Sequence, residues 1–70
     1  ELQEWLQARR LPVPAYAIVE TRGQAHRQEF VVRCTVAALQ VERVGEGASR
    51  RAAEQVAAQA VLAHLKSLAT

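Results

Sequence analysis

Residues 28–36 read Gln28-Glu29-Phe30-Val31-Val32-Arg33-Cys34-Thr35-Val36, and this stretch decides the fold. Its side chains alternate, because one set is apolar and the set between them is mostly polar. Period-two alternation with one mostly polar face predicts a β-strand in a sheet that is covered on one side only. We expect the covered side to carry Phe30, Val32, Cys34 and Val36, and the open side to carry Glu29, Val31, Arg33 and Thr35.

Two further strands are expected beside this one. Residues 15–22 are rich in β-forming side chains, and Gly23-Gln24-Ala25-His26 supplies the turn that follows them. A third, weaker strand is expected at about residues 39–45, after a short turn at Ala37-Ala38. Residues 45–48 contain two glycines and are expected to break the strand pattern.

A short helix is predicted from residue 1 to about residue 10. Leu2, Trp5 and Leu6 have the spacing that places them on one apolar face of a helix. The prolines that follow cannot continue a helix and force an extended turn, which ends this element: Pro12 and Pro14.

A long helix is predicted from Arg50 to about Leu68, because this stretch is made of helix formers and contains no Gly or Pro. Ser49 is a favourable N-cap for it. Leu62 and Leu65 do not sort cleanly onto either side of this helix. Its apolar side is otherwise expected to carry Ala53, Val56, Ala57, Ala60, Val61, His64 and Leu68.

The order of elements predicts an α+β fold of the type α-β-β-β-α. Seventy residues make a single domain, here 1–70, with apolar surface for one core only. Both helices must therefore pack on one face of a three-stranded antiparallel sheet. The core is expected to include Phe30, Val32, Cys34, Ala57 and Ala60, with Trp5 and Tyr16 packed in it and not free to stack on bases.

The composition limits the classes of function. The formal net charge is only +2, but eight of the nine basic residues are Arg, whose planar fork suits phosphate recognition. An Arg-biased genome would explain the same count. No apolar run is long enough to cross a membrane. The absence of Met and the immediate helical pattern indicate a piece of a longer protein, and the single Cys34 fits a reducing cytoplasm.

Catalysis by this chain is not expected. The seven carboxylates are scattered and none is Asp, so they form no cluster of the kind that holds catalytic metals. His26 and His64 have no Cys or Asp nearby at the spacing of a metal site. We therefore expect no catalytic residue, no metal ligand and no cofactor.

The segment Gly45-Glu46-Gly47-Ala48-Ser49-Arg50-Arg51 has the features of an anion site. A glycine-bearing loop leads into a helix N-terminus, where free N–H groups and the helix dipole favour a phosphate. Arg50 and Arg51 oppose that dipole, so an external anion would offset their cost. The alternative is an ordinary solvated first turn with a Ser cap.

Two other groups of polar residues are candidates for contact with a ligand. Gln3, Glu4 and Gln7 form a stripe on the first helix whose amides and carboxylate can hydrogen-bond sugar hydroxyls and base edges. His26 lies in the turn between two strands, where its ring can donate and accept. For both groups, a plain solvated surface is the alternative explanation.

Together these segments resemble the double-stranded-RNA-binding domain family over nearly the whole chain. The family pattern opens its first strand with Pro-x-Tyr, and Pro14-Ala15-Tyr16 matches it. The first hairpin and the second helix match at Gly23, His26, Phe30, Gly45, Gly47, Ser49, Arg50, Arg51, Ala53, Ala57 and Ala58. One departure is Glu54, which stands where the family usually has a third basic residue. Glu is common there in the C-terminal domain of bacterial ribonuclease III, which this sequence resembles further.

The resemblance implies a role in RNA contact for each matching group. Residues of the first helix would meet one minor groove, and the loop with Gly23 and His26 would enter the next. The start of the second helix would meet phosphates across the intervening major groove. The implied RNA-binding residues are Gln3, Glu4, Gln7, Gly23, His26, Ser49, Arg50, Arg51 and Gln55.

The resemblance also implies a parent enzyme that cleaves and processes double-stranded RNA, such as rRNA precursors. Its nuclease domain would hold Mg2+, form a homodimer and act in the cytoplasm, and that domain is absent from this chain. One alternative is the same module from a helicase or an RNA-modifying enzyme. Another is a degenerate copy used for protein–protein contact, against which Arg50 and Arg51 argue.

Overall fold

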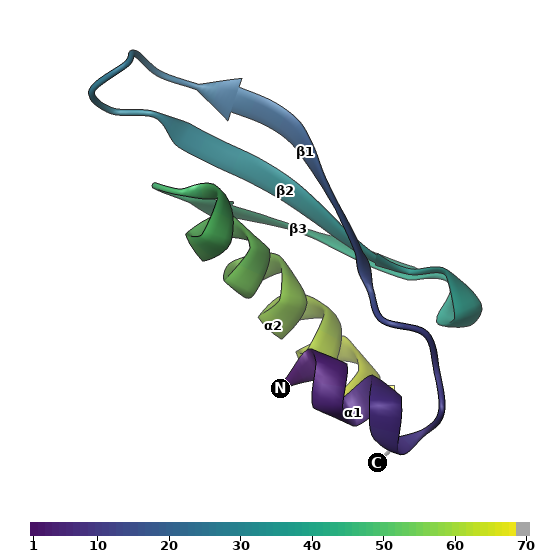
Figure 1. The fold of residues 1–70 in the computed structure, drawn as a ribbon. Coiled ribbons are helices and arrows are strands. Elements are labelled where there is room, and N and C mark those ends of the chain that lie inside the picture. Colours follow the sequence, from purple (N-terminus) through teal and green to yellow (C-terminus); the bar gives the residue numbers. More distant parts are fainter. Residues whose placement is uncertain (69–70) are drawn as a thin grey trace.

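The computed structural model describes residues 1–68 and has the expected α-β-β-β-α order (Figure 1). The strands form one antiparallel sheet in the order β1-β2-β3, with α2 lying across it and α1 packed beside α2. The elements are α1 (Leu2–Ala8), β1 (Ala15–Arg22), β2 (Glu29–Val36), a 3-10 turn η1 (Ala37–Leu39), β3 (Val41–Gly47) and α2 (Arg50–Leu68).

The central strand β2 confirms the alternation, with one exception. Val32, Cys34 and Val36 are buried beneath α2, whereas Glu29 and Arg33 are exposed on the open face. Val31 was expected on the open face but is only 5% exposed. It lies on the central strand between its register partners Glu20 and Glu46, so residues of both neighbouring strands flank it.

The core gathers apolar residues from both helices and from β2 and β3. Val32, Cys34 and Ala57 are buried as expected. Phe30 and Ala60 are only half-buried, so the prediction that these two residues are buried was wrong. Phe30 sits near the open end of the sheet, where α2 begins and α1 does not reach. The largest cluster contains Leu2, Leu6, Cys34, Val36, Val41, Ala57, Val61, Leu62 and Leu65, with Trp5 and Tyr16 packed against it as predicted.

The buried side of α2 differs from the one predicted. Val56 is 46% exposed and Leu68 is 68% exposed, although both were expected on the apolar side. Leu62 and Leu65, which could not be assigned, are buried. The reason is that α2 packs against α1 as well as against the sheet, so its buried arc is turned toward α1.

The third strand, β3, extends further at its C-terminal end than expected, and it includes Gly45 and Gly47. A Cβ atom on Gly45 would overlap the backbone of Ala53 and Ala57, and one on Gly47 would lie 2.7 Å from the Ala53 nitrogen. These glycines therefore do not break the strand. They let β3 lie directly against the backbone of α2, which side chains would prevent. The start of β3 is also later than expected, because Ala37–Leu39 forms the 3-10 turn.

The first helix ends earlier than predicted, at Ala8, and it ends in an unusual way. Arg10 adopts a left-handed conformation with φ of 58°. The Arg10 N–H donates to the Gln7 carbonyl, and the Leu11 N–H donates to the Leu6 carbonyl at 2.9 Å. This is the Schellman arrangement, in which glycine normally occupies the left-handed position.

Arg10→Gly should raise the free energy of unfolding by about 1 kcal/mol, because glycine takes the left-handed conformation without the steric cost of a Cβ atom. Urea denaturation followed by the fluorescence of Trp5 measures the change.

Arg9→Gly is the matched control. Arg9 has a negative φ of −103°, and its guanidinium stacks over the Trp5 ring at 3.6 Å from the centroid. This substitution should therefore lower stability. A loss of stability in Arg10→Gly as large as that in Arg9→Gly would contradict the assignment of strain to Arg10.

Candidate nucleic-acid interface

The first turn of α2 is capped as the sequence predicted. The Ser49 hydroxyl accepts a hydrogen bond from the Ala52 N–H at 3.1 Å, and the Ser49 carbonyl accepts from the Ala53 N–H at 3.0 Å. The first bond satisfies a backbone donor that a helix start leaves free, and the second is the first hydrogen bond of the helix itself. Ser49 therefore has a structural role at this position, whatever it contributes to ligand contact.

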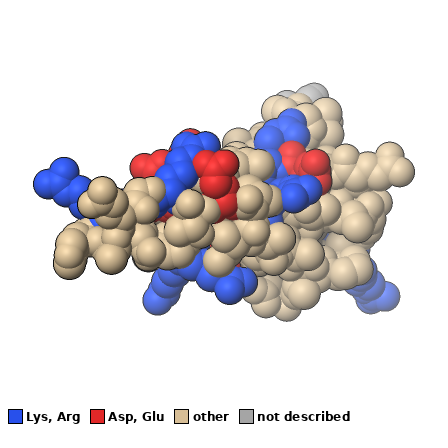
Figure 2. Space-filling model, turned by 90° about the horizontal axis from the view of Figure 1, so that it is seen from above, with Lys and Arg blue, Asp and Glu red and all other residues tan. Residues whose placement is uncertain are grey.

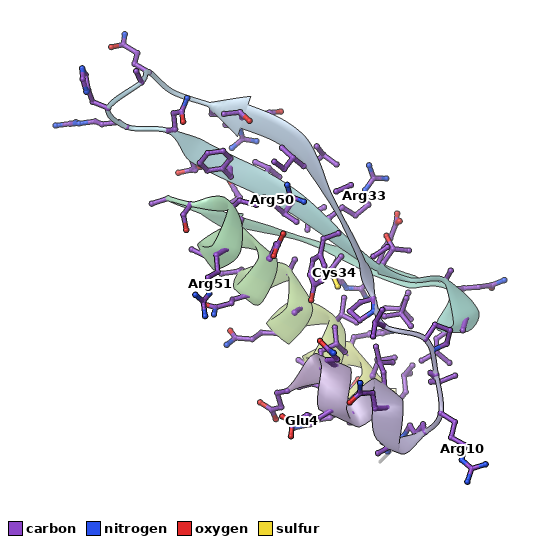
Figure 3. The ribbon with its side chains drawn as sticks, viewed as in Figure 1. Glu4, Arg10, Arg33, Cys34, Arg50 and Arg51 are labelled. Atoms are coloured by element: carbon purple, nitrogen blue, oxygen red, sulfur yellow. The ribbon has the colours of Figure 1, made fainter. Side chains whose placement is uncertain are left out.

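The two arginines that follow Ser49 are in different situations. The Arg50 Nε donates to a Glu54 carboxylate oxygen at 2.9 Å. The Arg51 side chain makes no hydrogen bond or ion pair within residues 1–68, and it projects away from the sheet (Figure 3). The sequence analysis assigned both arginines the same role, but of the two only Arg51 presents a charge without a partner among residues 1–68.

The polar stripe on α1 is confirmed as an exposed surface. Gln3, Glu4 and Gln7 are exposed, while Leu2 and Leu6 on the other side of the helix are buried. Glu4 also lies in the first turn, where a carboxylate suits the helix dipole.

The structure brings this stripe next to the start of α2. A shallow depression of about 330 Å³ lies between the two helices, and Gln3 from α1 lines it together with Arg51 and Gln55 from α2. Glu54 and Tyr16 line the same depression. Residues that are almost fifty positions apart in the sequence thus form one continuous surface.

The loop between β1 and β2 is held open by Gly23. This glycine has a φ of +86°, and a Cβ atom at this position would overlap the Arg27 carbonyl. The Arg27 N–H closes the turn by donating to the Gln24 carbonyl at 2.8 Å. His26 is therefore presented on an exposed tip, as the sequence predicted, and Gly23 shapes the loop through its backbone.

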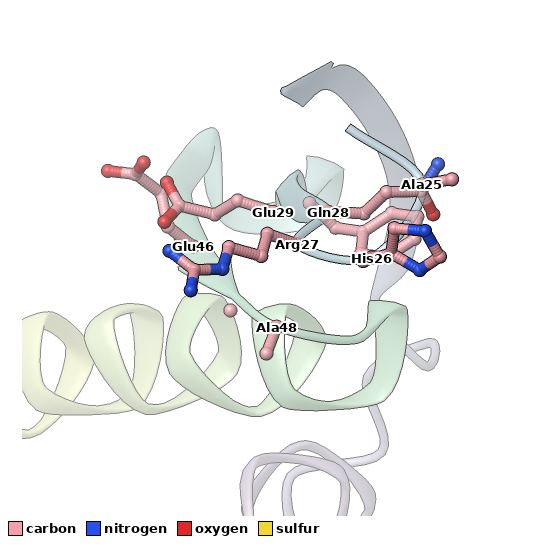
Figure 4. A pocket seen from close by; sticks show the side chains of 9 residues that line it. Ala25, His26, Arg27, Gln28, Glu29, Glu46 and Ala48 are labelled. Atoms are coloured by element: carbon pink, nitrogen blue, oxygen red, sulfur yellow. The ribbon is translucent and has the colours of Figure 1, made fainter. Parts of the chain in front are cut away.

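His26 does not join Gln3 and Arg51, because its loop projects from the opposite end of the molecule from α1 (Figure 1). The domain is elongated, with extents of 41 × 20 × 18 Å. A second depression of about 620 Å³ separates the loop from the segment leading into α2, and His26, Arg27, Glu46 and Gly47 line it (Figure 4).

Arg27 is a candidate that the sequence analysis did not select. It lies in the loop beside His26 and extends into the second depression, toward the side that carries Glu29 and Glu46 (Figure 4). The available signal was a basic residue directly next to the loop histidine.

The remaining charges do not form one basic patch. On the face shown in Figure 2, basic side chains are spread out and several lie directly beside acidic ones. Arg22 pairs with Glu20 and Glu46, and these carboxylates raise its pKa. Arg43 lies 3.1 Å from the His64 ring, while Arg10 and Arg33 project on the opposite side from Arg51 (Figure 3).

Comparison with known proteins identifies the family of the chain. Residues 1–65 match the model of the family described as "Double-stranded RNA binding motif". The chain belongs to this family. The chain is also 59% identical over 66 residues to Ribonuclease 3 of Delftia acidovorans (strain DSM 14801 / SPH-1). That match covers 94% of this chain but only 29% of the relative.

The family assignment confirms the resemblance drawn from the sequence, and the structure confirms the α+β order that the resemblance implied. This double-stranded-RNA-binding domain spans less than a third of the length of the ribonuclease 3 that it matches. Within residues 1–68, no helix has the length and apolar character to span a membrane. The same residues contain no group of three His, Cys, Asp or Glu placed to hold a metal ion.

Tyr16, which lines the depression beside Gln3 and Arg51, stays uncharged at neutral pH. Burial, followed by the effects of the neighbouring Cys34 and Glu54, raises the pKa of Tyr16 to about 12. Burial also raises the pKa of the Cys34 thiol, which lies next to the Tyr16 hydroxyl. A neutral phenol at this place adds no negative charge that would repel a phosphate.

The ordinary pKa of the Tyr16 phenol is 10.0, so as pH rises this group loses its proton in the unfolded chain at a lower pH than in the folded chain. The contribution of Tyr16 to the free energy of unfolding should be fully present below pH 10 and should fall as pH rises toward about 12. Absorbance of the phenolate at alkaline pH measures the titration directly, since Tyr16 is the single Tyr. Tyr16→Phe should remove this part of the decline. Phenolate absorbance that appears with a midpoint at 10 in the folded protein would contradict the prediction.

Proposed function

We propose that this chain is the substrate-binding domain of a ribonuclease III, and that it grips double-stranded RNA by shape, 2′-hydroxyls and phosphates. The observation that supports the proposal most strongly is the shared depression of Gln3, Arg51 and Gln55. Neutral hydrogen-bonding groups and an unpaired cation meet there on one surface. A-form RNA offers 2′-hydroxyls in its shallow minor groove directly beside phosphates, so this combination suits it.

The elongated shape supports contact at three places along a duplex. In the proposed complex, Gln3, Glu4 and Gln7 of α1 face one minor groove. His26, in the loop that Gly23 shapes, enters the next minor groove. Phosphates across the major groove meet the start of α2, at Ser49, Arg50, Arg51 and Gln55. Such an arrangement spans roughly 16 base pairs and reads shape in preference to sequence.

The parent enzyme is proposed from the relative's name and from the resemblance of this sequence to the ribonuclease III domain. In that parent, a separate nuclease domain would hold Mg2+ and cut the RNA, form the homodimer, and act in the cytoplasm on rRNA precursors and structured mRNA. The part played by this chain is to hold the duplex. Its own exposed residues supply hydrogen bonds and charge for that task.

The chain should bind duplex RNA more tightly than a DNA duplex of the same sequence, because DNA lacks the 2′-hydroxyls that α1 and the His26 loop are proposed to contact. It should not cut RNA in the presence of Mg2+. Fluorescence anisotropy with labelled duplexes measures the preference, and gel analysis of the incubated RNA measures cleavage. Equal affinity for both duplexes, or cleavage by the pure chain, would refute the respective statement.

Arg51→Ala should weaken binding to all duplexes alike and lower the slope of log affinity against log salt by about 1, because one fewer counterion is released. Gln3→Ala and His26→Ala should each weaken binding by about fivefold with little change in slope, since a neutral hydrogen bond is worth on the order of 1 kcal/mol and releases no ion.

Arg33→Ala is the matched control for Arg51→Ala, because Arg33 projects from the opposite side of the molecule (Figure 3). It removes the same charge and should change affinity and slope little. If Gln3→Ala and His26→Ala leave affinity untouched while Arg51→Ala abolishes binding, the domain is only a basic patch and the groove assignment is wrong.

A further inference from the structure

We propose that Glu54 competes with RNA phosphate for Arg50 and thereby limits the affinity of the domain for duplex RNA. The inference rests on the proposed function and concerns a residue of the same surface. Glu54 would then have two effects. It replaces a basic residue that could contact phosphate, and its carboxylate also partly neutralises the neighbouring Arg50.

The contact that supports this inference is the ion pair within the first turns of α2. The Arg50 Nε lies 2.9 Å from a Glu54 carboxylate oxygen. The Glu54 side chain is 29% exposed and that of Arg50 is 57% exposed, so the carboxylate is the better fixed of the two groups. In the free protein, the guanidinium of Arg50 is therefore partly neutralised before any RNA arrives.

The position of Glu54 places its charge on the proposed interface. It lines the depression between α1 and α2 together with Gln3, Arg51 and Gln55. A phosphate that approaches Arg51 also approaches the Glu54 carboxylate one turn away along the helix. A fixed negative charge at this place opposes the approach of a polyanion.

The ion pair is weak enough for RNA to break. Exposed pairs at i, i+4 on a helix contribute little, and the order with the acidic residue after the basic one is the less favourable of the two. A phosphate can thus take Arg50 from Glu54, but Arg50 then exchanges one anion for another. The gain from Arg50 is smaller than that from Arg51, which has no such partner within residues 1–68.

The test compares wild type with Glu54→Gln, which keeps the shape of the side chain and removes its charge. Binding to a 20-base-pair RNA duplex should tighten by about two- to fivefold, the range expected for loss of a competing exposed ion pair. The slope of log affinity against log salt should steepen by up to about 1. The gain should be equal for a DNA duplex, because both duplexes present phosphates.

Arg50→Gln tests whether Glu54 acts through Arg50. In this background, Glu54→Gln should tighten binding much less than in wild type, because there is no guanidinium left to release and only the repulsion between Glu54 and phosphate is removed. A gain as large in the Arg50→Gln background as in wild type would overturn the proposal, since Glu54 would then act on the RNA without Arg50. A loss of affinity in the single variant Glu54→Gln would also overturn it, because Glu54 would then hold Arg50 in a binding position.

Glu42→Gln is the matched control for net charge. Glu42 is exposed on β3 and pairs in register with Thr35, on the open face of the sheet away from α2. Its substitution should leave affinity and salt slope nearly unchanged, and a gain equal to that of Glu54→Gln would overturn the proposal. If wild type itself does not bind duplex RNA, the proposed function fails. If wild type binds and Glu54→Gln has no effect, only the inference about Glu54 fails.

Discussion

The close approach of β3 to α2 is the constraint on which the rest of this small structure depends. Gly45 and Gly47 lie directly against the backbone at Ala53 and Ala57, where any Cβ atom would overlap the helix. A thin core made largely of Val and Leu can exclude water only if the layers approach this closely. The contact also fixes where the first turn of α2 points, and with it the direction of the Arg51 side chain.

Two of the three proposed contact regions are tied together by the same packing. The first helix contributes Leu2 and Leu6 to a core shared with Val61, Leu62 and Leu65 of α2. The polar side of α1 is therefore held at a defined place beside the start of α2, where Gln3 and Arg51 share one depression. The third region is set apart on the β1–β2 loop, whose shape depends on the left-handed Gly23. Separation along a 41 Å axis suits a ligand that presents its features at intervals.

The distribution of charge favours the proposed binding side of the domain, although the net charge is only +2. On the open face of the sheet, Arg22 is held by Glu20 and Glu46, and the neighbouring Glu46 raises the pKa of Glu29. The part of that face around Arg22 is therefore acidic or internally paired and unsuited to phosphate. The unpaired cation at the start of α2 stands out because most other arginines have partners or project elsewhere. A small number of charges at defined positions favours recognition of the shape of the duplex over general attraction to any polyanion.

The sequence by itself determined most features that depend on neighbours within a few residues, although the end of α1 and the start of β3 differed from expectation. The alternation from Phe30 to Val36, the turn at Gly23 and the Ser49 cap all rest on local backbone geometry, so each was predictable. The i, i+4 pair of Arg50 and Glu54 was equally local, but Glu54 was interpreted only as a missing basic residue.

The tertiary structure alone decided the features that depend on which surfaces meet. The burial of Leu62 and Leu65 and the exposure of Val56 follow from the docking of α1. The two glycines of β3 were interpreted as a strand break because the backbone that approaches them comes from a different element. The shared surface of Gln3 and Arg51, with His26 held apart, is likewise a result of packing between distant segments, which no local periodicity encodes.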